Sequence, residues 1–419
     1  MYSLRRFGII LGLSTIRGLL AGLGNPQETF RSIHIAGTNG KGSVASALAT
    51  IFYLAGYRVG LYTSPHLVHF NERICINGKP ISNEHVVDAY EAVRSVHQGD
   101  REPTFFEFST AMAFHEFGRK KVDWAIIETG MGGRLDATNV ISPALSIITN
   151  ISLEHQAYLG STLPKIAAEK AGIIKQGVPV VTGVSQPSVV RTVLEQAGKK
   201  QAPAYRLGNQ FRIRRNPGSD RFTYFGVDAA VWKDIRTRLL GRYQVDNAAL
   251  VLAACEILNR DKTARLPEAE IRKGLLENSW PGRLEVLSDA PLVLLDGAHN
   301  MAAIRPLARF LSERFAGRYI TLVSGILDDK AYPEMLGCLL PRCNRVILTQ
   351  PKIDRAIPAD ALKKVAEKII ADVSVIPDVP SALNYAIRTS KPDHVICIAG
   401  SLYLVGEVKE AIETGSVVL

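Results

Sequence analysis

Short runs of β-branched and other apolar residues alternate along the chain with longer segments of helical period. A run of the first kind predicts a strand, a segment of the second kind predicts a helix, and their alternation predicts an α/β fold with a largely parallel sheet. Strands are expected at residues 32–36, 58–62, 122–128, 144–149, 178–182, 292–295, 319–324, 345–349 and 394–399. Helices are expected at residues 43–55, 84–96, 104–117, 163–174, 246–258 and 359–371.

One segment interrupts this alternation. Residues 211–215 and 221–225 flank the turn-rich sequence NPGSD at 216–220, which predicts a β-hairpin at the margin of the first domain. A chain of 419 residues exceeds what a single core usually organises. A Pro-Gly step and polar residues near 281–289 precede a new strand, so we expect two domains, 1–286 and 287–419.

Composition places the chain among globular proteins, with 47% apolar and 21% charged residues. A formal charge of +10 favours anionic partners, and nucleotides, polyanionic small molecules and nucleic acid all qualify. Five scattered cysteines without a CxxC pair indicate a reducing cytosol rather than a disulfide framework.

The first residues resemble a signal peptide only faintly. Arg5 and Arg6 precede the apolar run 7–13, but Arg17 interrupts it and no cleavage pattern follows, so a short amphipathic helix is expected. No stretch reaches the ~20 apolar residues that a membrane span requires.

A glycine loop follows the first expected strand. Residues 37–43 read GTNGKGS, between the strand at 33–36 and the helix at 44–55. In this context glycines let backbone N–H groups approach phosphates, the helix N-terminus favours negative charge, and Lys41 reaches the terminal phosphates. Gly42 separates Lys41 from Ser43, which departs from the strict GxxxxGK[ST] pattern. The flanking elements favour a phosphate site over a glycine turn with a solvated lysine, and no NKxD base reader of a GTPase is present.

Three further segments carry candidate ligands for a metal ion. The apolar strand 122–128 ends in Glu128, the placement of a magnesium-ligating carboxylate beside a phosphate loop, and the loop TGMGGRLDATN follows it with Arg134 and Asp136. Ser64 stands before a proline after another strand, where an ordinary turn is the alternative. His155 is isolated, and an isolated histidine is usually structural.

Lys170 shares a helical face with Ile166 and Ile173. Spacing alone favours a lysine whose amine snorkels to solvent. Burial near a metal would instead lower its pKa and make the amine a nucleophile toward carbon dioxide, and the carbamate so formed is an anion that could bind magnesium.

The second domain offers a polar strand end. The strand at 292–295 continues into DGAHN, and Arg283 lies just before it near the expected hinge. Strand ends of this kind carry ligand contacts in α/β sheets, so Arg283, Asp296 and His299 are candidates for closing over a nucleotide held by the first domain. An ordinary strand-to-helix turn explains the spacing equally well.

Taken together and in this order, these segments resemble the folylpolyglutamate synthase/dihydrofolate synthase family of the Mur-ligase superfamily. The resemblance covers almost the whole chain, and GTNGKGS marks the superfamily whereas TSPHL with NERI and GGRLDATN is specific to the folate branch. The motifs that carry it are HIAGTNGKGS, YTSPHLVHFNERICING, ETGMGGRLDATN, EHQAYLG, IAAEKAGII, WPGRLE, LLDGAHN, SGILDDK and AGSLYLVGEV. It implies a P-loop ATPase domain with a parallel-rich central sheet, followed by a smaller Rossmann-like α/β domain.

The resemblance also implies a site, position by position. Lys41, Glu128, His155 and a carbamylated Lys170 would be the catalytic residues, which reverses the preference for snorkelling. The magnesium ligands would be Ser64, Glu128 and His155. The ATP site, completed across the domain interface, would consist of Asn39, Gly40, Lys41, Gly42, Ser43, Asn247, Arg283, Asp296 and His299. The region that holds the pterin of dihydropteroate would comprise Thr104, Phe105, Phe106, Glu107, Arg134, Leu135, Asp136 and Ala137.

The implied activity is an ATP-dependent ligation of L-glutamate to the γ-carboxylate of a (tetrahydro)folate, and also to dihydropteroate, through an acyl phosphate. ATP and Mg²⁺ are the implied cofactors, with a monovalent cation as a further candidate, and the protein is expected to be a cytoplasmic monomer without nucleic-acid or membrane partners. Two positions depart from the family pattern: Glu154 stands where Asp is common, and Ala331 stands where a further Asp is usual.

Two other functions remain open on sequence. One is a Mur-type ligase that acts on a peptidoglycan or cyanophycin-like substrate. The other is a non-catalytic P-loop regulator or a basic nucleic-acid binder, for which the RIRR segment at 212–215 is the only hint and a solvated hairpin edge an equal explanation.

Overall fold

The computed structural model describes residue 8, residue 10 and residues 12–419, apart from 99–100 and 217–218. The chain forms two compact units. The N-terminal unit comprises Phe70–Arg238, Gln244–Ser279 and the described part of Met1–His66, and the C-terminal unit comprises Leu67–His69, Leu239–Tyr243 and Trp280–Leu419. Of the stretch 7–13, where a short amphipathic helix was expected, residues 7, 9 and 11 lie outside the described residues. Residues 8, 10, 12 and 13 are described and are not helical, and the first described helix starts at Ser14.

The N-terminal unit is built on an eight-stranded sheet in the order β4-β3-β2-β5-β1-β6-β7-β8. Neighbouring strands in the part β2-β5-β1-β6-β7-β8 of this order are parallel. β3 is antiparallel to β2, and β4 is antiparallel to β3. The strands are β1 (Arg31–Ala36), β2 (Val59–Tyr62), β3 (Ile74–Ile76), β4 (Lys79–Pro80), β5 (Trp124–Glu128), β6 (Leu145–Ile148), β7 (Val180–Thr182) and β8 (Ala204–Arg206). The parallel-rich sheet expected from the alternating pattern is confirmed.

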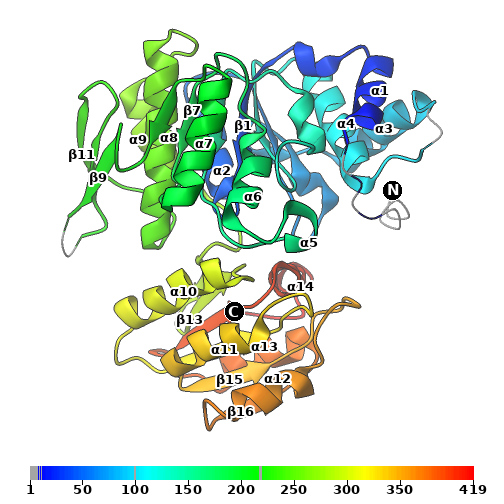
Figure 1. The fold of residues 1–419 in the computed structure, drawn as a ribbon. Helices are drawn as coiled ribbons and strands as arrows, with labels where there is room; N and C mark the ends of the chain where they lie inside the picture. The colour runs from blue at the N-terminus through cyan, green and yellow to red at the C-terminus, as the bar shows by residue number, and fades with distance from the viewer. Residues whose placement is uncertain (1–7, 9, 11, 99–100, 217–218) are drawn as a thin grey trace. The chain divides into compact units, whose positions relative to one another are not determined.

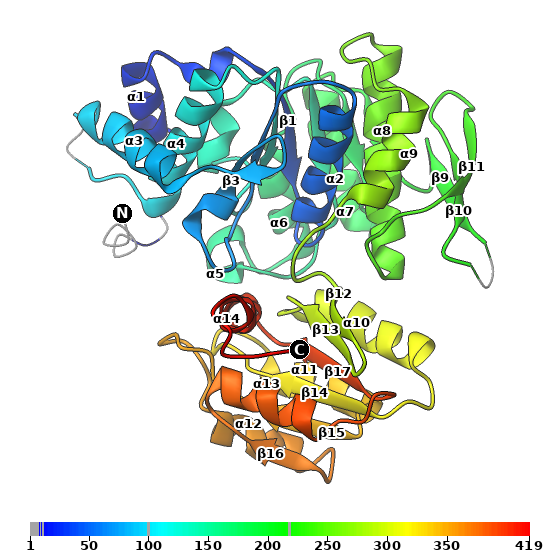
Figure 2. The same cartoon turned by 180° about the vertical axis from the view of Figure 1, so that it is seen from behind.

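Helices cover both faces of this sheet. Figures 1 and 2 show α6 and α7 on one face and α2, α8 and α9 on the other, while α1, α3 and α4 lie together at one end of the unit. The helices are α1 (Ser14–Gly22), α2 (Lys41–Leu54), α3 (Asn83–Ser95), α4 (Phe105–Arg119), α5 (Gln156–Leu159), α6 (Leu163–Ala171), α7 (Pro187–Lys199), α8 (Arg242–Arg260) and α9 (Glu268–Glu277). The central strands β1, β2, β5, β6 and β7 are almost entirely buried on both sides, which is why they appear in the sequence as short continuous apolar runs.

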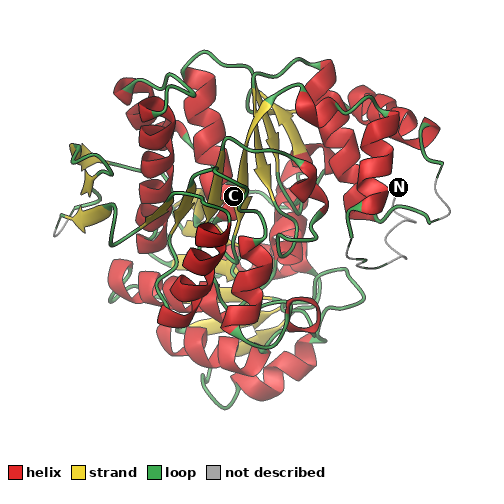
Figure 3. Cartoon of the chain, turned by 45° about the horizontal axis from the view of Figure 1, so that its top comes forward, coloured by secondary structure: helices red, strands yellow, loops and turns green. Residues whose placement is uncertain are grey.

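The expected hairpin is present and has a third strand. β9 (Arg212–Arg215) pairs antiparallel with β10 (Phe222–Phe225), and β11 (Val231–Ile235) adds to the other side of β10. Figures 1 and 3 show this small sheet beside α8 and α9. It is fixed to α8 by the buried Glu256, whose carboxylate accepts a 2.7 Å hydrogen bond from the Tyr224 hydroxyl. β11 was missed because only its last residue is buried, so its sequence has no apolar run.

The RIRR arginines of β9 have partners inside the protein. Arg215 forms a 2.7 Å ion pair with Asp246, and the guanidinium groups of Arg212 and Arg214 lie 4.7 and 5.8 Å from the centre of the Phe225 ring. These contacts favour the hairpin-edge explanation of the segment.

The C-terminal unit contains a six-stranded sheet in the order β12-β13-β17-β14-β15-β16, parallel except for the edge strand β12. Its strands are β12 (Glu285–Asp289), β13 (Leu292–Asp296), β14 (Ile320–Ser324), β15 (Arg345–Leu348), β16 (Val373–Val375) and β17 (Val395–Ala399). Its helices are α10 (Met301–Arg314), α11 (Tyr332–Leu339), α12 (Ala359–Ala366), α13 (Val379–Arg388) and α14 (Leu402–Glu413).

Strand residues of this unit alternate between two cores. Leu294 and Leu322 pack with α10, α11 and α12, whereas their neighbours Leu295 and Val323 pack with α13 and α14. Successive side chains of a strand point to opposite faces of the sheet, so one strand supplies both cores. The expected smaller α/β domain is therefore confirmed. Among the described residues no helix is long and apolar enough to cross a bilayer.

Candidate active site

The phosphate-loop sequence forms a strand, a tight loop and a helix, as expected. β1 ends at Ala36, and α2 begins at Lys41 with Gly40 as its N-cap in the left-handed conformation at φ 85°. A Cβ atom at Gly40 would lie 2.6 Å from Oδ1 of Asn247, so both the conformation and the space require glycine here. Glycine offers no side chain to cap the first turn of α2, whose N–H groups are therefore the donors that phosphates accept from.

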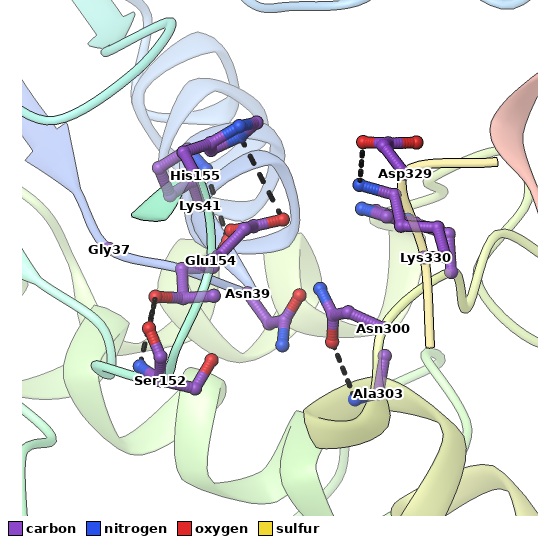
Figure 4. Close-up of polar contacts among 12 residues, drawn as sticks. Gly37, Asn39, Lys41, Ser152, Glu154, His155, Asn300, Ala303, Asp329 and Lys330 are labelled. Atoms are coloured by element: carbon purple, nitrogen blue, oxygen red, sulfur yellow. Dashed lines mark hydrogen bonds and ion pairs between the residues drawn. The ribbon is translucent and has the colours of Figure 1, made fainter. Parts of the chain in front are cut away.

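The loop is held by residues that follow β6. The Asn150 side chain accepts from the Asn39 N–H at 3.0 Å and donates to the Asn39 carbonyl at 2.8 Å, and the Thr149 hydroxyl donates to the same carbonyl at 2.7 Å. The Ser152 N–H donates to the Thr38 hydroxyl at 3.0 Å (Figure 4). Sequence reasoning missed Thr149, Asn150 and Ser152. The signal was the polar pair Thr149-Asn150 directly after a buried strand, next to the strand that enters the loop.

Lys41, Glu128 and Ser64 meet, although they come from three segments. The Lys41 amine lies 3.8 Å from Oε1 of the buried Glu128 and donates to the Thr38 carbonyl at 3.2 Å. The Ser64 N–H donates to Oε2 of Glu128 at 3.3 Å. β5 lies between β1 and β2 in the sheet, and the carboxyl ends of neighbouring parallel strands meet at one edge. This order brings the end of β5 beside the phosphate loop.

His155 adopts the left-handed conformation at φ 50° just before α5. Its Nε2 lies 3.9 Å from Oε1 of Glu154, and Figure 4 shows both residues with Lys41. Among the described residues no group of three or more His, Cys, Asp or Glu side chains forms a metal site. The structure thus places Glu128, Ser64, Glu154 and His155 around the loop, and a magnesium ion would need further oxygens from a nucleotide, water or a modified side chain.

Lys170 is buried rather than snorkelling. Its side chain is 2% exposed, and its amine donates to the Gly37 carbonyl at 2.7 Å. Burial lowers its pKa to about 7, and repulsion from Lys41 adds to this effect. The carboxylates that oppose the shift are Glu154, Asp136 and Glu128. The spacing-based preference for snorkelling was wrong because helix α6 turns this face onto the phosphate loop rather than toward solvent.

The first expected substrate segment caps α4. The Thr104 hydroxyl and the Glu107 carboxylate form a capping box, in which the Thr104 N–H donates to Glu107 at 2.8 Å and the Glu107 N–H donates to Thr104 at 3.2 Å. Arg101 adds a 2.7 Å ion pair to Glu107. These two side chains therefore fix the start of the helix.

The two phenylalanines between them line the loops. The Phe106 ring lies 6.0 Å from that of Tyr62, and a Cβ atom at Gly130 would come within 2.5 Å of it. The Phe105 ring is 6.1 Å from Phe70 and 5.1 Å from the Arg73 guanidinium. The start of α4 thus connects the segment after β2 with the glycine loop after β5.

The second expected substrate segment is shaped by Asp136. Its buried carboxylate accepts from the Met131 N–H at 2.8 Å and from the Thr138 N–H at 3.0 Å, and burial raises its pKa. On either side of Asp136, Leu135 is half-buried and Ala137 is buried. Arg134 points outward in a 2.9 Å ion pair with Glu169. Asp136 holds the loop closed, and Arg134 fastens the loop to α6.

Asn247 belongs to a second hydrogen-bond network, which connects α8 to the phosphate loop. Its amide nitrogen donates to Gln244 at 2.8 Å, and the Gln244 amide donates to the Ser43 hydroxyl at 3.2 Å. All three side chains are buried. Gln244, which sequence reasoning did not single out, therefore connects Ser43 to Asn247.

In the C-terminal unit, Asp296 organises the segment around its strand end. Its carboxylate accepts from the Leu284 N–H at 2.8 Å and from the Ala298 N–H at 2.9 Å. Burial raises its pKa, and the nearby Arg283 opposes that shift most strongly. The His299 Nδ1 donates to the Gly297 carbonyl at 2.8 Å, which fixes the ring's tautomer. The structure thus brings Arg283, Asp296 and His299 together within this unit.

Two family models match the chain. Residues 35–255 match the Mur ligase middle domain, and residues 282–402 match the glutamate ligase domain of Mur ligases. A dihydrofolate synthase/folylpolyglutamate synthase from Bacillus subtilis is 37% identical over 97% of this chain and 96% of its own length.

Solved structures agree with these matches. Escherichia coli FolC in complex with DHPP and ADP superimposes with a TM-score of 0.90 at 28% identity, over 99% of this chain and 97% of its own. A bifunctional folylpolyglutamate synthase/dihydrofolate synthase from Yersinia pestis, complexed with AMPPNP and Mn ion, gives a TM-score of 0.86 at 29% identity, over 97% and 94% of the two chains.

Proposed function

Because the chain belongs to the folylpolyglutamate synthase/dihydrofolate synthase family of Mur ligases, we propose that it joins L-glutamate to the γ-carboxylate of a (tetrahydro)folate, and also to dihydropteroate, at the expense of ATP. The observation that carries this proposal is the convergence of Lys41, Glu128 and Lys170 on one phosphate loop. The relatives solved with nucleotides, DHPP and Mn ion support it.

The chemistry requires an activated carboxylate. A carboxylate is a poor electrophile, and transfer of the γ-phosphoryl group of ATP to it creates a leaving group that the amine of glutamate can displace. The first turn of α2 supplies N–H donors to the phosphates, and Lys41 supplies positive charge to the group in transfer. A bound Mg²⁺ would neutralise further phosphate charge, and we assign Ser64, Glu128 and His155 to hold it.

The nucleotide and substrate residues are assigned from the family resemblance, and the contacts within the N-terminal unit support part of this assignment. Asn39, Gly40, Gly42 and Ser43 form the phosphate loop with Lys41, and Asn247 lies against Gly40. We propose that Arg283, Asp296 and His299 contribute to the nucleotide from the C-terminal domain. The side chains of Thr104, Glu107 and Asp136 bond to the backbone and fix the two substrate segments. We therefore assign direct contact with the pterin mainly to Phe105, Phe106 and Leu135.

Lys170 is proposed to carry a carbamate. Its pKa of about 7 leaves a large share of the amine neutral at physiological pH, and only the neutral amine attacks carbon dioxide. The product is an anion near Lys41, which replaces the repulsion between two amines by an attraction.

We further propose a monovalent cation as cofactor, a cytoplasmic monomer, and a division of the chain at residues 286 and 287. The glutamate ligase family model, which begins at residue 282, supports a division in this part of the chain, although the C-terminal compact unit already begins at Trp280 and β12 (Glu285–Asp289) spans residues 286 and 287.

ADP release tests the function directly. The protein is expected to release ADP with dihydropteroate or tetrahydrofolate only when glutamate is present, because the amine must consume the acyl phosphate for turnover to continue. Each acceptor is assayed with and without glutamate, and with a peptidoglycan precursor as the competing acceptor. Glutamate-dependent ADP release with the precursor alone, or with none of the three, would contradict the proposal.

A separate prediction concerns His155. His155→Ala is expected to raise the Mg²⁺ concentration for half-maximal ADP release by about tenfold, since losing one contributor to a metal site costs roughly that much affinity. His115→Ala is the matched control, because His115 is a half-buried histidine on α4. An unchanged magnesium titration in His155→Ala would remove His155 from the ligand set.

A further inference from the structure

The chain enters the C-terminal unit for the last time between Ser279 and Trp280. The residues just before this crossing are the end of α9 and Asn278, which is 1% exposed. We define residues 278–280 as the crossing segment. The contacts that this segment makes inside the N-terminal unit determine which changes in that unit can affect it.

The crossing segment is attached to the phosphate-loop helix by one hydroxyl group. Ser46, one turn after Ser43 on α2, has a hydroxyl that donates a hydrogen bond to the Asn278 side-chain oxygen and lies 3.2 Å from the Ser279 carbonyl. The Ser46 side chain is buried as well. A hydrogen bond between two buried groups is costly to break, because each partner would be left without water to replace it.

The two helices behind this contact pack backbone to backbone. A Cβ atom at Gly274 of α9 would lie 2.4 Å from the Ile51 side chain and 3.1 Å from Cα of Ile51 on α2. The Asn278 N–H donates to the Gly274 carbonyl at 2.9 Å, which closes α9 directly over this contact. A change in the first turns of α2 is therefore passed to the crossing segment through α9 packing and the Ser46 hydroxyl.

A second hydroxyl of α2 repeats the arrangement. Ser43 accepts from Gln244, the first residue of the N-terminal unit after the segment Leu239–Tyr243 of the other unit. The phosphate-loop helix thus contacts residues beside two crossings, through the hydroxyls of its first and second turns. Phosphates bound to the first turn would order this helix and whatever its hydroxyls hold.

We propose that Ser46 and Asn278 are positioning residues that transmit the nucleotide state of the phosphate loop to the crossing segment. The inference rests on the proposed function, because it requires a nucleotide at the loop. Neither residue is among those assigned to the nucleotide, the metal ion or the substrate. Their contribution is to make the start of the C-terminal unit responsive to the presence of ATP.

Hydrogen exchange measured by mass spectrometry tests this on the full-length protein with and without ADP and Mg²⁺. In the wild type, nucleotide is expected to slow amide exchange in the phosphate loop and also in peptides that span the crossing segment. In Ser46→Ala the loop is still protected, whereas protection of the crossing segment is lost. The kcat of ligation falls about fivefold with an almost unchanged KM for ATP, the size expected for one buried hydrogen bond.

Thr50→Ala is the matched control. Thr50 also lies on α2, and its hydroxyl donates within that helix, to the Ser46 carbonyl at 2.9 Å. This variant is expected to retain nucleotide-dependent protection of the crossing segment. Asn278→Ala breaks the same contact from the other side, so the double variant should lose no more protection or kcat than either single variant.

The outcomes separate the two proposals. If nucleotide does not protect the phosphate loop of the wild type, the proposed function fails, and this inference fails with it. If the loop is protected but the crossing segment is not, or if Ser46→Ala and Asn278→Ala keep its protection, only the inference is overturned. A thermal melt of each variant confirms that the compared proteins are folded.

Discussion

Lys41→Ala is expected to lower glutamate-dependent ADP release by about a thousandfold while the protein stays folded. The Lys41 amine is the cation beside Glu128 at the phosphate loop, and removing one preorganised charge that stabilises a phosphoryl transfer costs roughly this much in kcat. Folding should not suffer, because the three hydrogen bonds from Asn150 and Thr149 to Asn39 remain when the single 3.2 Å bond from the Lys41 amine to the Thr38 carbonyl is lost.

The measurement is a coupled ADP assay on purified wild-type and variant protein, with a thermal melt of each. Lys199→Ala serves as the control, since Lys199 is an exposed lysine at the end of α7 and tests for a general effect of lost positive charge. A Lys41→Ala protein that turns over at a near-normal rate would show that the phosphate loop does not act on ATP in the proposed way.

Lys170→Ala should produce the second large loss, of about a hundredfold or more in kcat, and a small carboxylate such as acetate should restore part of it. The substitution removes both the amine that would carry the carbamate and the 2.7 Å hydrogen bond to the Gly37 carbonyl. It leaves a space beside the phosphate loop that an added carboxylate can enter, with the same charge as the carbamate. Lys175→Ala is the matched control, because burial also lowers the pKa of Lys175, to about 8.

The pH dependence of the wild type provides an independent check. Protein stripped of carbon dioxide and then given the same concentration of dissolved carbon dioxide at each pH should regain activity more slowly as the pH falls through about 7. The reason is the lowered pKa of Lys170: the neutral amine that reacts predominates above about 7, and the unreactive ammonium predominates below it. Full activity of Lys170→Ala, or reactivation that is equally fast on both sides of pH 7, would rule out the carbamate.

Sequence alone predicted the elements whose formation depends on neighbours along the chain. The strand, glycine loop and helix at residues 33–55 are specified by a local apolar run, by Gly40 and by a helical segment, and the structure has them. The central strands of both sheets were predicted within a few residues for the same reason. Edge strands such as β4 and β8 were missed, because they are short and little buried and so leave no apolar pattern.

Sequence also defined the motifs that identify the family, since glycines, acids and lysines at fixed spacing are visible without coordinates. It could not decide whether Lys170 reaches solvent, because that depends on which surface covers the face of α6. Nor could it show that Asn150 holds Asn39 or that Ser46 contacts Asn278, which are far apart along the chain.

Only the tertiary structure decided these matters, and the physical reason is the same in each case. A side chain's pKa and hydrogen bonds depend on desolvation and on partners brought in by other strands and helices. For Lys170 the partners are the Gly37 carbonyl and the Lys41 charge, which the order of strands in the sheet places beside α6. Local sequence specified the chemical groups of this protein, and packing specified which of them share one low-dielectric space.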